Sequence, residues 1–146
     1  MLDRLLQHLG YQLVAVPSQV HTAAGAAALV KGHLASKKVG RANYDVLQFA
    51  DDLAAAEPVL RAALVVTPAP LTGDAHYDAW TAGLVEYRLT QVDIPAPVWV
   101  DGPTRFSPED WLAAGTPGDP DEVRARTPAP FAKRGVLIDE VDLVSV

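Results

Sequence analysis

The spacing of apolar residues along the chain predicts a mainly helical protein. Apolar positions recur three and four residues apart, as on one face of an α-helix, over about residues 2–9, 20–36, 43–57, 59–66 and 74–90. Gly40 marks a break between the second and third of these helices, and Asn43 is a candidate N-cap. Asp74 is the N-cap candidate of the last one.

The C-terminal third is punctuated by eight prolines between Pro95 and Pro130, which exclude long helices there. We expect a short extended piece over 98–100, a helix start over 107–110, and single helical turns over 121–126, 130–134 and 139–144. Gly135 fits a helix C-cap from which Val136–Ile138 packs back. The alternating run over 11–16 predicts one short β-strand. The predicted fold is therefore a compact multi-helix domain with a proline-rich C-terminal third.

Composition narrows the class of protein. The 146 residues are 49% hydrophobic and 21% charged, as in a folded domain, and the chain contains no cysteine. Disulfides, thiolate metal sites and cysteine nucleophiles are therefore excluded. The longest apolar run, over 23–30, is too short to cross a membrane, and no targeting signal follows Met1. We expect a cytoplasmic protein without a cofactor.

The net charge of −6 is unevenly distributed. Residues 5–44 contain no acid, whereas residues 45–123 hold fourteen acids against three arginines, a net charge of −11. The acidic middle has two interpretations: a solvated surface, or a face that engages a basic partner. The basic residues of the first stretch are candidates for weak nucleic-acid contacts, namely Lys31, Lys37, Lys38 and Arg41.

Motifs for catalysis are weak. Asp74, His76 and Asp78 could suggest a metal site, but on a helix the two carboxylates share a face that His76 does not, so we expect no metal. An N-cap followed by a first-turn acid explains the acidic pair better. No serine has a nucleophile-elbow context and no glycine-rich phosphate loop exists, so we expect no enzyme.

The aromatic residues fall into two groups. Tyr77, Trp80 and Tyr87 repeat at helical spacing and are predicted core residues. Trp99, Trp111 and Phe131 lie among prolines, where they would hold loops on the helical core, or where one or two of them could anchor a protein partner.

Two stretches carry a family resemblance. Residues 2–16, Leu-Asp-Arg-Leu-Leu-Gln-His-Leu-Gly-Tyr-Gln-Leu-Val-Ala-Val, resemble the last helix and trailing strand of Xre-type helix-turn-helix domains. The remainder resembles the C-terminal domain of actinobacterial helix-turn-helix proteins regarded as antitoxins. This second likeness rests on Phe49–Leu53, Thr72–Asp74, Trp80, Ala82–Glu86, Pro95–Trp99, Thr127–Asp139 and Asp142–Leu143.

The resemblance implies a domain of a toxin–antitoxin system that neutralises a nucleotidyltransferase-like toxin and takes part in transcription regulation. Residues 1–18 would be the end of a helix-turn-helix, and residues 19–146 a helical partner-binding domain. An Xre domain has four helices before the one that corresponds to the helix at Leu2, and the recognition helix is among them. We therefore expect this chain to bind DNA only weakly, or through such N-terminal helices.

Under this hypothesis the acidic middle masks a basic surface of the toxin. The candidate contacts are Asp51, Asp52, Glu57, Asp74, Asp78 and Glu86, with Trp99 and Trp111 as anchors. Two alternatives remain open. One is a transcription-regulator domain that forms a homodimer, for which pairing of the strand over 11–16 would be suitable, or that senses a ligand. The other is a small enzyme that uses Asp74, His76 and Asp78.

Overall fold

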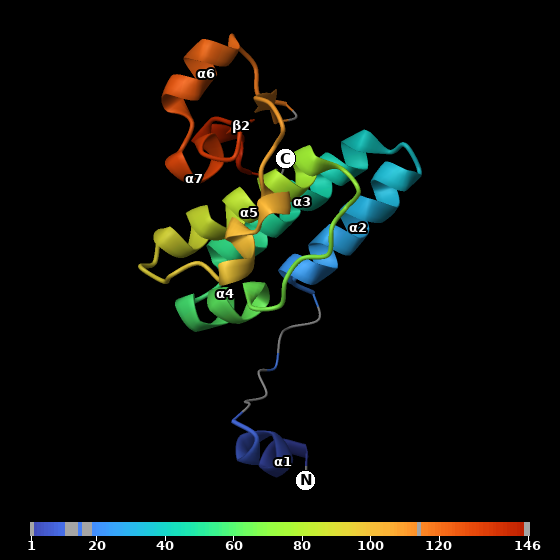
Figure 1. The fold of residues 1–146 in the computed structure, drawn as a ribbon, viewed down its shortest axis with the longest axis vertical. Coiled ribbons are helices and arrows are strands. Elements are labelled where there is room, and N and C mark those ends of the chain that lie inside the picture. The colour runs from blue at the N-terminus through green and yellow to red at the C-terminus, as the bar shows by residue number, and fades with distance from the viewer. Residues whose placement is uncertain (1, 11–14, 16–18, 114, 145–146) are drawn as a thin grey trace.

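The computed structural model describes residues 2–10, 15, 19–113 and 115–144 (Figure 1). Its helices are α1 (Leu2–His8), α2 (Ala23–Ala35), α3 (Val39–Ala55), α4 (Pro58–Val65), α5 (Ala75–Thr90), α6 (Pro120–Arg126) and α7 (Ala129–Ala132). The 3₁₀ helices are η1 (Val98–Asp101), η2 (Pro103–Arg105) and η3 (Glu140–Asp142). Strands β1 (Trp111–Leu112) and β2 (Val136–Leu137) pair in parallel. The prediction of a mainly helical, compact domain is confirmed.

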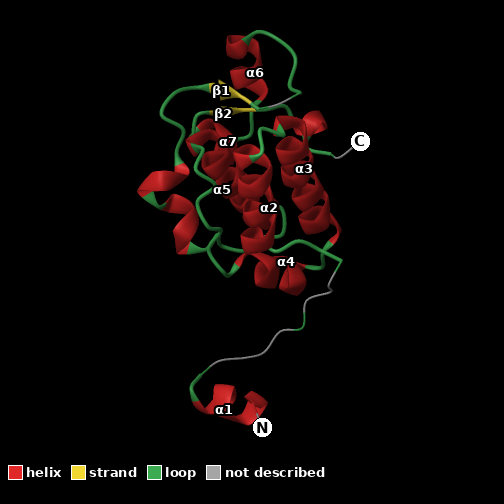
Figure 2. Cartoon of the chain, turned by 90° about the vertical axis from the view of Figure 1, so that its right-hand side faces the viewer, coloured by secondary structure: helices red, strands yellow, loops and turns green. Residues whose placement is uncertain are grey.

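Helix α5 is the centre of the domain. It buries residues on all of its faces, from Tyr77 to Leu89, so it must be covered on every side. Helices α2, α3 and α4 cover it on one side, while α7, β2, η1 and η2 cover the rest (Figures 1 and 2). Trp80, Leu84 and Val85 of α5 are fully buried at this junction. The core position predicted for Tyr77 and Trp80 is confirmed.

Helices α2 and α3 form a hairpin whose turn differs from the expected one. The break falls at Lys37, which adopts a left-handed φ of 57°, and not at Gly40. The backbone N–H of Lys38 bonds the carbonyl of His33 at 2.8 Å and closes the turn. The prediction of Asn43 as an N-cap is also wrong, because Asn43 lies within α3 and its side chain accepts the Tyr77 hydroxyl at 2.5 Å.

The proline-rich third contains two further corrections. Residues 98–101 form the 3₁₀ helix η1 and not an extended piece. No helix begins at Ser107, because the Ser107 N–H donates to Arg134 O and the Trp111 N–H donates to Gly135 O, both at 2.8 Å. These bonds draw the segment into β1 beside β2. Gly135 has a φ of +73°, and Val136–Ile138 is buried, so the predicted helix end and return are confirmed.

The N-terminal helix α1 lies apart from the other helices (Figures 1 and 2). Three of its leucines are exposed, with 61% of Leu2, 60% of Leu5 and 63% of Leu9 accessible, and Leu6 is half-buried. Gly10 ends the helix with a φ of +78°, as expected. The strand predicted over 11–16 lies outside the described residues except for Ala15 and stays a prediction. Across the described ranges, none of the helices has the length and apolar character needed to cross a bilayer.

Gly83 tests the packing of α5 against α7. A Cβ at this position would lie 2.8 Å from Phe131 Cδ1 and 3.2 Å from the carbonyl oxygen of Pro130. Because Phe131 is fully buried, Gly83→Ala should lower the free energy of unfolding by about 1–3 kcal/mol, as overpacking does. Urea denaturation followed by circular dichroism measures this.

The control is Gly40→Ala on α3, where a Cβ would meet no atom within 4 Å. This change should stabilise the protein by roughly 0.5–1 kcal/mol, because alanine is the better helix former. Equal effects of the two changes would mean that α5 and α7 do not pack as described.

Candidate partner-binding surfaces

Two of the predicted contact carboxylates hold the start of α5. Asp74 is its N-cap and accepts the backbone N–H of His76 at 2.9 Å. Asp78 is buried and accepts both the backbone N–H and the hydroxyl of Thr72, at 2.8 and 2.9 Å. Asp78 therefore fixes the loop before α5 and is not available to a partner.

Glu86 is held by an ion-pair cluster at the junction of α5, α7 and η1. Its carboxylate accepts Arg134 Nη1 at 2.5 Å and Lys133 Nζ at 2.8 Å. Arg134 is 1% exposed and also donates to the carbonyl oxygens of Val100 and Pro130, at 3.0 and 2.7 Å. The cluster joins three segments, so Glu86 has a structural role.

Asp51, Asp52 and Glu57 lie at the corner where α3 gives way to α4. Asp52 accepts the backbone N–H and Nδ1 of His21, at 2.8 and 2.6 Å. Burial lowers the pKa of Arg88, and the charge of half-buried Asp51 is among those that partly offset this lowering. Glu57 is exposed at the start of α4. Of these three predicted acidic contacts, Glu57 is the one that is exposed to solvent.

Both candidate tryptophans pack against the core. Trp99 donates from Nε1 to Val65 O at 2.9 Å, and the Arg105 guanidinium lies 4.8 Å from its ring. Trp111 stacks on His76, with ring centroids 5.1 Å apart. Their predicted role in holding loops is confirmed, and Phe131 is likewise buried. Their role as partner anchors stays a prediction.

Asp74, His76 and Asp78 do not converge. His76 Nδ1 lies 2.8 Å from Ser107 Oγ, while Asp74 and Asp78 are engaged by backbone N–H groups. Ser107 Oγ donates its proton to Glu109 O and therefore accepts a hydrogen bond from His76. His76 thus does not act as a base that activates Ser107 as a nucleophile. Within the described residues, no group of three or more His, Cys, Asp or Glu side chains could hold a metal ion.

An apolar groove lies between α4 and the segment that follows α5. It has a volume of about 160 Å³ and is lined by Ala62, Val65, Val66, Leu89, Ile94, Pro95 and Pro97. Val66, one of the lining residues, is 67% exposed, and Val59 on α4 and Val98 after Pro97 are 80% and 91% exposed. Exposed Glu57 and Asp93 flank it along the chain. The sequence analysis did not predict this surface, because Val59 and Val66 fit the predicted helix over 59–66 and Val98 fits the predicted extended piece over 98–100.

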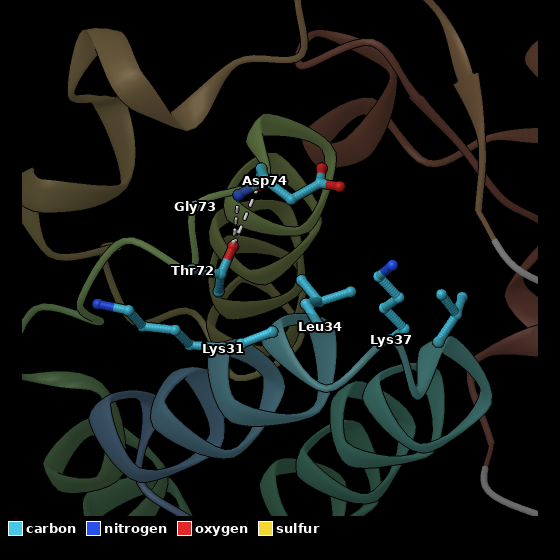
Figure 3. Close-up of a pocket in the computed structure, with 8 residues that line it drawn as sticks. Lys31, Leu34, Lys37, Thr72, Gly73 and Asp74 are labelled. Atoms are coloured by element: carbon cyan, nitrogen blue, oxygen red, sulfur yellow. Dashed lines mark hydrogen bonds between the residues drawn. The ribbon is translucent and has the colours of Figure 1, made fainter.

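A second, larger pocket lies at the α2–α3 turn (Figure 3). Its volume is about 500 Å³, and α2, the turn and the loop before α5 form its walls. Lys31 and Lys37, two of the predicted basic contacts, line it together with Asp74. Lys38 and Arg41 are exposed beside it but do not line it. The acid-free stretch over 5–44 was the sequence signal for this surface.

The Arg134 cluster can be tested by stability. Arg134→Leu should lower the free energy of unfolding by about 3 kcal/mol, because it leaves the carbonyls of Val100 and Pro130 without their donor and Glu86 with only Lys133. Arg126→Leu is the matched control, since Arg126 is 52% exposed in its pair with Asp139 and should cost no more than about 1 kcal/mol. Denaturant unfolding of both variants measures the difference, and equal losses would contradict a buried cluster.

Tyr77 gives a pH dependence with a defined sign. Burial, with a smaller contribution from the charge of Asp74, raises the pKa of its phenol. Above pH 10 the unfolded chain ionises this group before the folded chain does, so stability falls as the pH rises further. In Tyr77→Phe this part of the alkaline loss should vanish, although the bond to Asn43 is also removed. Unfolding measured from pH 8 to 11 compares the slopes, and an unchanged slope would contradict the assignment.

No protein-family model, no curated protein and no solved structure matches this chain. The surfaces described above are therefore the basis for assigning a function.

Proposed function

We propose that this chain is a non-enzymatic domain that binds a protein partner and neutralises it by covering a basic surface, as an antitoxin does. The observation that carries the proposal is the apolar groove on α4, together with exposed Glu57 and Asp93, which precede its two lining segments in the chain. An apolar centre with a charged rim is the usual arrangement of a protein interface.

The residues that could perform catalysis support the same conclusion. Asp74, His76 and Asp78 each have a partner within the domain that fixes their position. By contrast, Val59, Val66 and Val98 expose most of their surface. Val66 also lines the groove, and exposed apolar surface at a groove typically marks an interaction site.

The chemistry of the partner follows from the charge. A toxin that acts on nucleotides needs a cationic substrate site, and carboxylates such as those of Glu57 and Asp93 can occupy it. Apolar contacts with the groove would then slow dissociation, while the net charge of −6 speeds the encounter. A nucleotidyltransferase-like toxin fits this description.

A second candidate is a regulator domain that dimerises. The exposed leucines of α1 favour it, because an apolar helix face without cover is a common site of self-association. Dimerisation and partner masking use different surfaces, so the two candidates can be separated.

The test starts with co-purification of the tagged chain from its native host and identification of a stoichiometric partner. Affinity is then measured for the variant that combines Glu57→Lys with Asp93→Asn, since asparagine tolerates the left-handed φ of 55° at position 93. Loss of two flanking charges should weaken binding by about tenfold or more, mostly through slower association at low salt.

The matched control combines Glu122→Lys with Glu109→Gln, which changes the net charge by the same amount at exposed positions far from α4 (Figure 1). Its affinity should stay close to that of the unchanged chain. Equal weakening by both variants, or recovery of the chain alone as a dimer in sedimentation, would refute masking through the α4 groove.

A further inference from the structure

The pocket at the α2–α3 turn has walls that its own hydrogen bonds hold in place. Thr72 is fixed by Asp78, to which its hydroxyl donates, and the same hydroxyl oxygen accepts the backbone N–H of Asp74 at 3.2 Å (Figure 3). On the opposite side, the left-handed residue Lys37 sets the turn. The pocket is therefore preformed, which reduces the entropy that a ligand must lose on binding.

The floor of this pocket is apolar. Leu34, Ala35 and Val39 line it, and 54% of Val39 is exposed. A volume of about 500 Å³ accommodates several aliphatic side chains, within the roughly 300–1,000 Å³ that is common for binding pockets.

The rim of the pocket is cationic. Lys31 and Lys37 line it, and exposed Lys38 and Arg41 add to the positive field. Asp74 is the one carboxylate among the lining residues in the described part of the chain, and it is engaged in capping α5. This end of the domain thus has a charge opposite to that of Glu57 and Asp93.

A nucleic acid fits this pocket poorly. None of the lining residues is aromatic, so no platform for stacking a base is present, and a sugar–phosphate backbone gains nothing from an apolar floor. An amphipathic protein segment with carboxylates matches both features, because its apolar side chains can cover the floor while its carboxylates reach the lysines.

The acidic, apolar C-terminal segment of this chain is already held elsewhere. Leu143 is 2% exposed and its carbonyl accepts Arg88 Nη2 at 3.3 Å. Glu140 accepts the Tyr87 hydroxyl at 2.9 Å. This segment is therefore not available to the pocket.

We infer that the pocket between the α2–α3 turn and the loop before α5 is a second docking site, which binds an amphipathic acidic segment of a protein partner. This second site is distinct from the one proposed for masking. Its charge is opposite to that of Glu57 and Asp93, and it shares no lining residue with the α4 groove. The domain would then join two partners of opposite charge.

The experiment measures the anisotropy of a fluorescent synthetic helical peptide of glutamates with leucines three and four residues apart. The full chain should bind it with a dissociation constant on the order of 1–100 µM. The variant that combines Lys31→Glu with Lys37→Asn should bind at least about tenfold more weakly, and asparagine preserves the left-handed backbone at position 37.

Val39→Asp is an independent variant with the same expected loss. An acid in the first turn of a helix is favourable, so α3 should stay folded while the new carboxylate repels the peptide. Lys38→Glu is the matched control, since Lys38 is exposed next to the pocket without lining it. Its effect should be at most about threefold, from the general field alone.

Three results would overturn the inference. The first is binding that Lys31→Glu with Lys37→Asn leaves unchanged. The second is equal binding of a control peptide in which lysines replace the glutamates. The third is failure of the acidic peptide together with Lys31-dependent binding of a DNA oligonucleotide, which would make this end a nucleic-acid surface. The α4 variants should bind the acidic peptide normally, so the two proposals fail separately.

Discussion

Helix α5 is covered on all sides, and most of the other features of the domain follow from this constraint. A helix of 16 residues with buried residues on all its faces cannot be satisfied by one neighbouring layer. The hairpin of α2 and α3 supplies one side and the proline-rich third supplies another. The prolines suit this role because they allow a chain that turns often and wraps, with Gly83 giving Phe131 room to approach.

Such wrapping leaves many segment ends inside the protein, and their carbonyl groups need donors. Buried arginines meet this need. Arg61 donates to the carbonyls of Ala54 and Ala56 at the end of α3, and Arg134 donates to those of Val100 and Pro130. A buried arginine can in turn pair with a carboxylate, as Arg134 does with Glu86. Arg61, Arg134 and Glu86 thus hold segments of the domain together.

The charge that remains at the surface is separated along α3. The cationic pocket lies at the start of this helix and the α4 groove lies beyond its end, and a helix of 17 residues is roughly 25 Å long. Two sites of opposite charge at that distance could be occupied simultaneously without contact between their ligands. If both proposals hold, the domain would connect two partners as well as cover one.

The sequence by itself determined the helical class and most helix positions. The apolar spacing over 74–90, the cap at Asp74 and the glycine at 135 act through neighbours within a few residues, so they can be read locally. The composition, 49% hydrophobic and free of cysteine, was equally sufficient to predict a core without disulfides.

Only the tertiary structure decided which residues are available. Asn43 was predicted to be a helix cap, but its side chain accepts the hydroxyl of Tyr77, which is distant in the chain. Ser107 was predicted to start a helix, but its N–H donates to the distant carbonyl of Arg134. Glu86 looked like a surface acid until the fold placed Arg134 beside it. The pocket and the groove likewise arise from segments far apart in sequence. Hydrogen bonds and ion pairs reach only a few ångströms, so their partners are set by the packing of the whole chain.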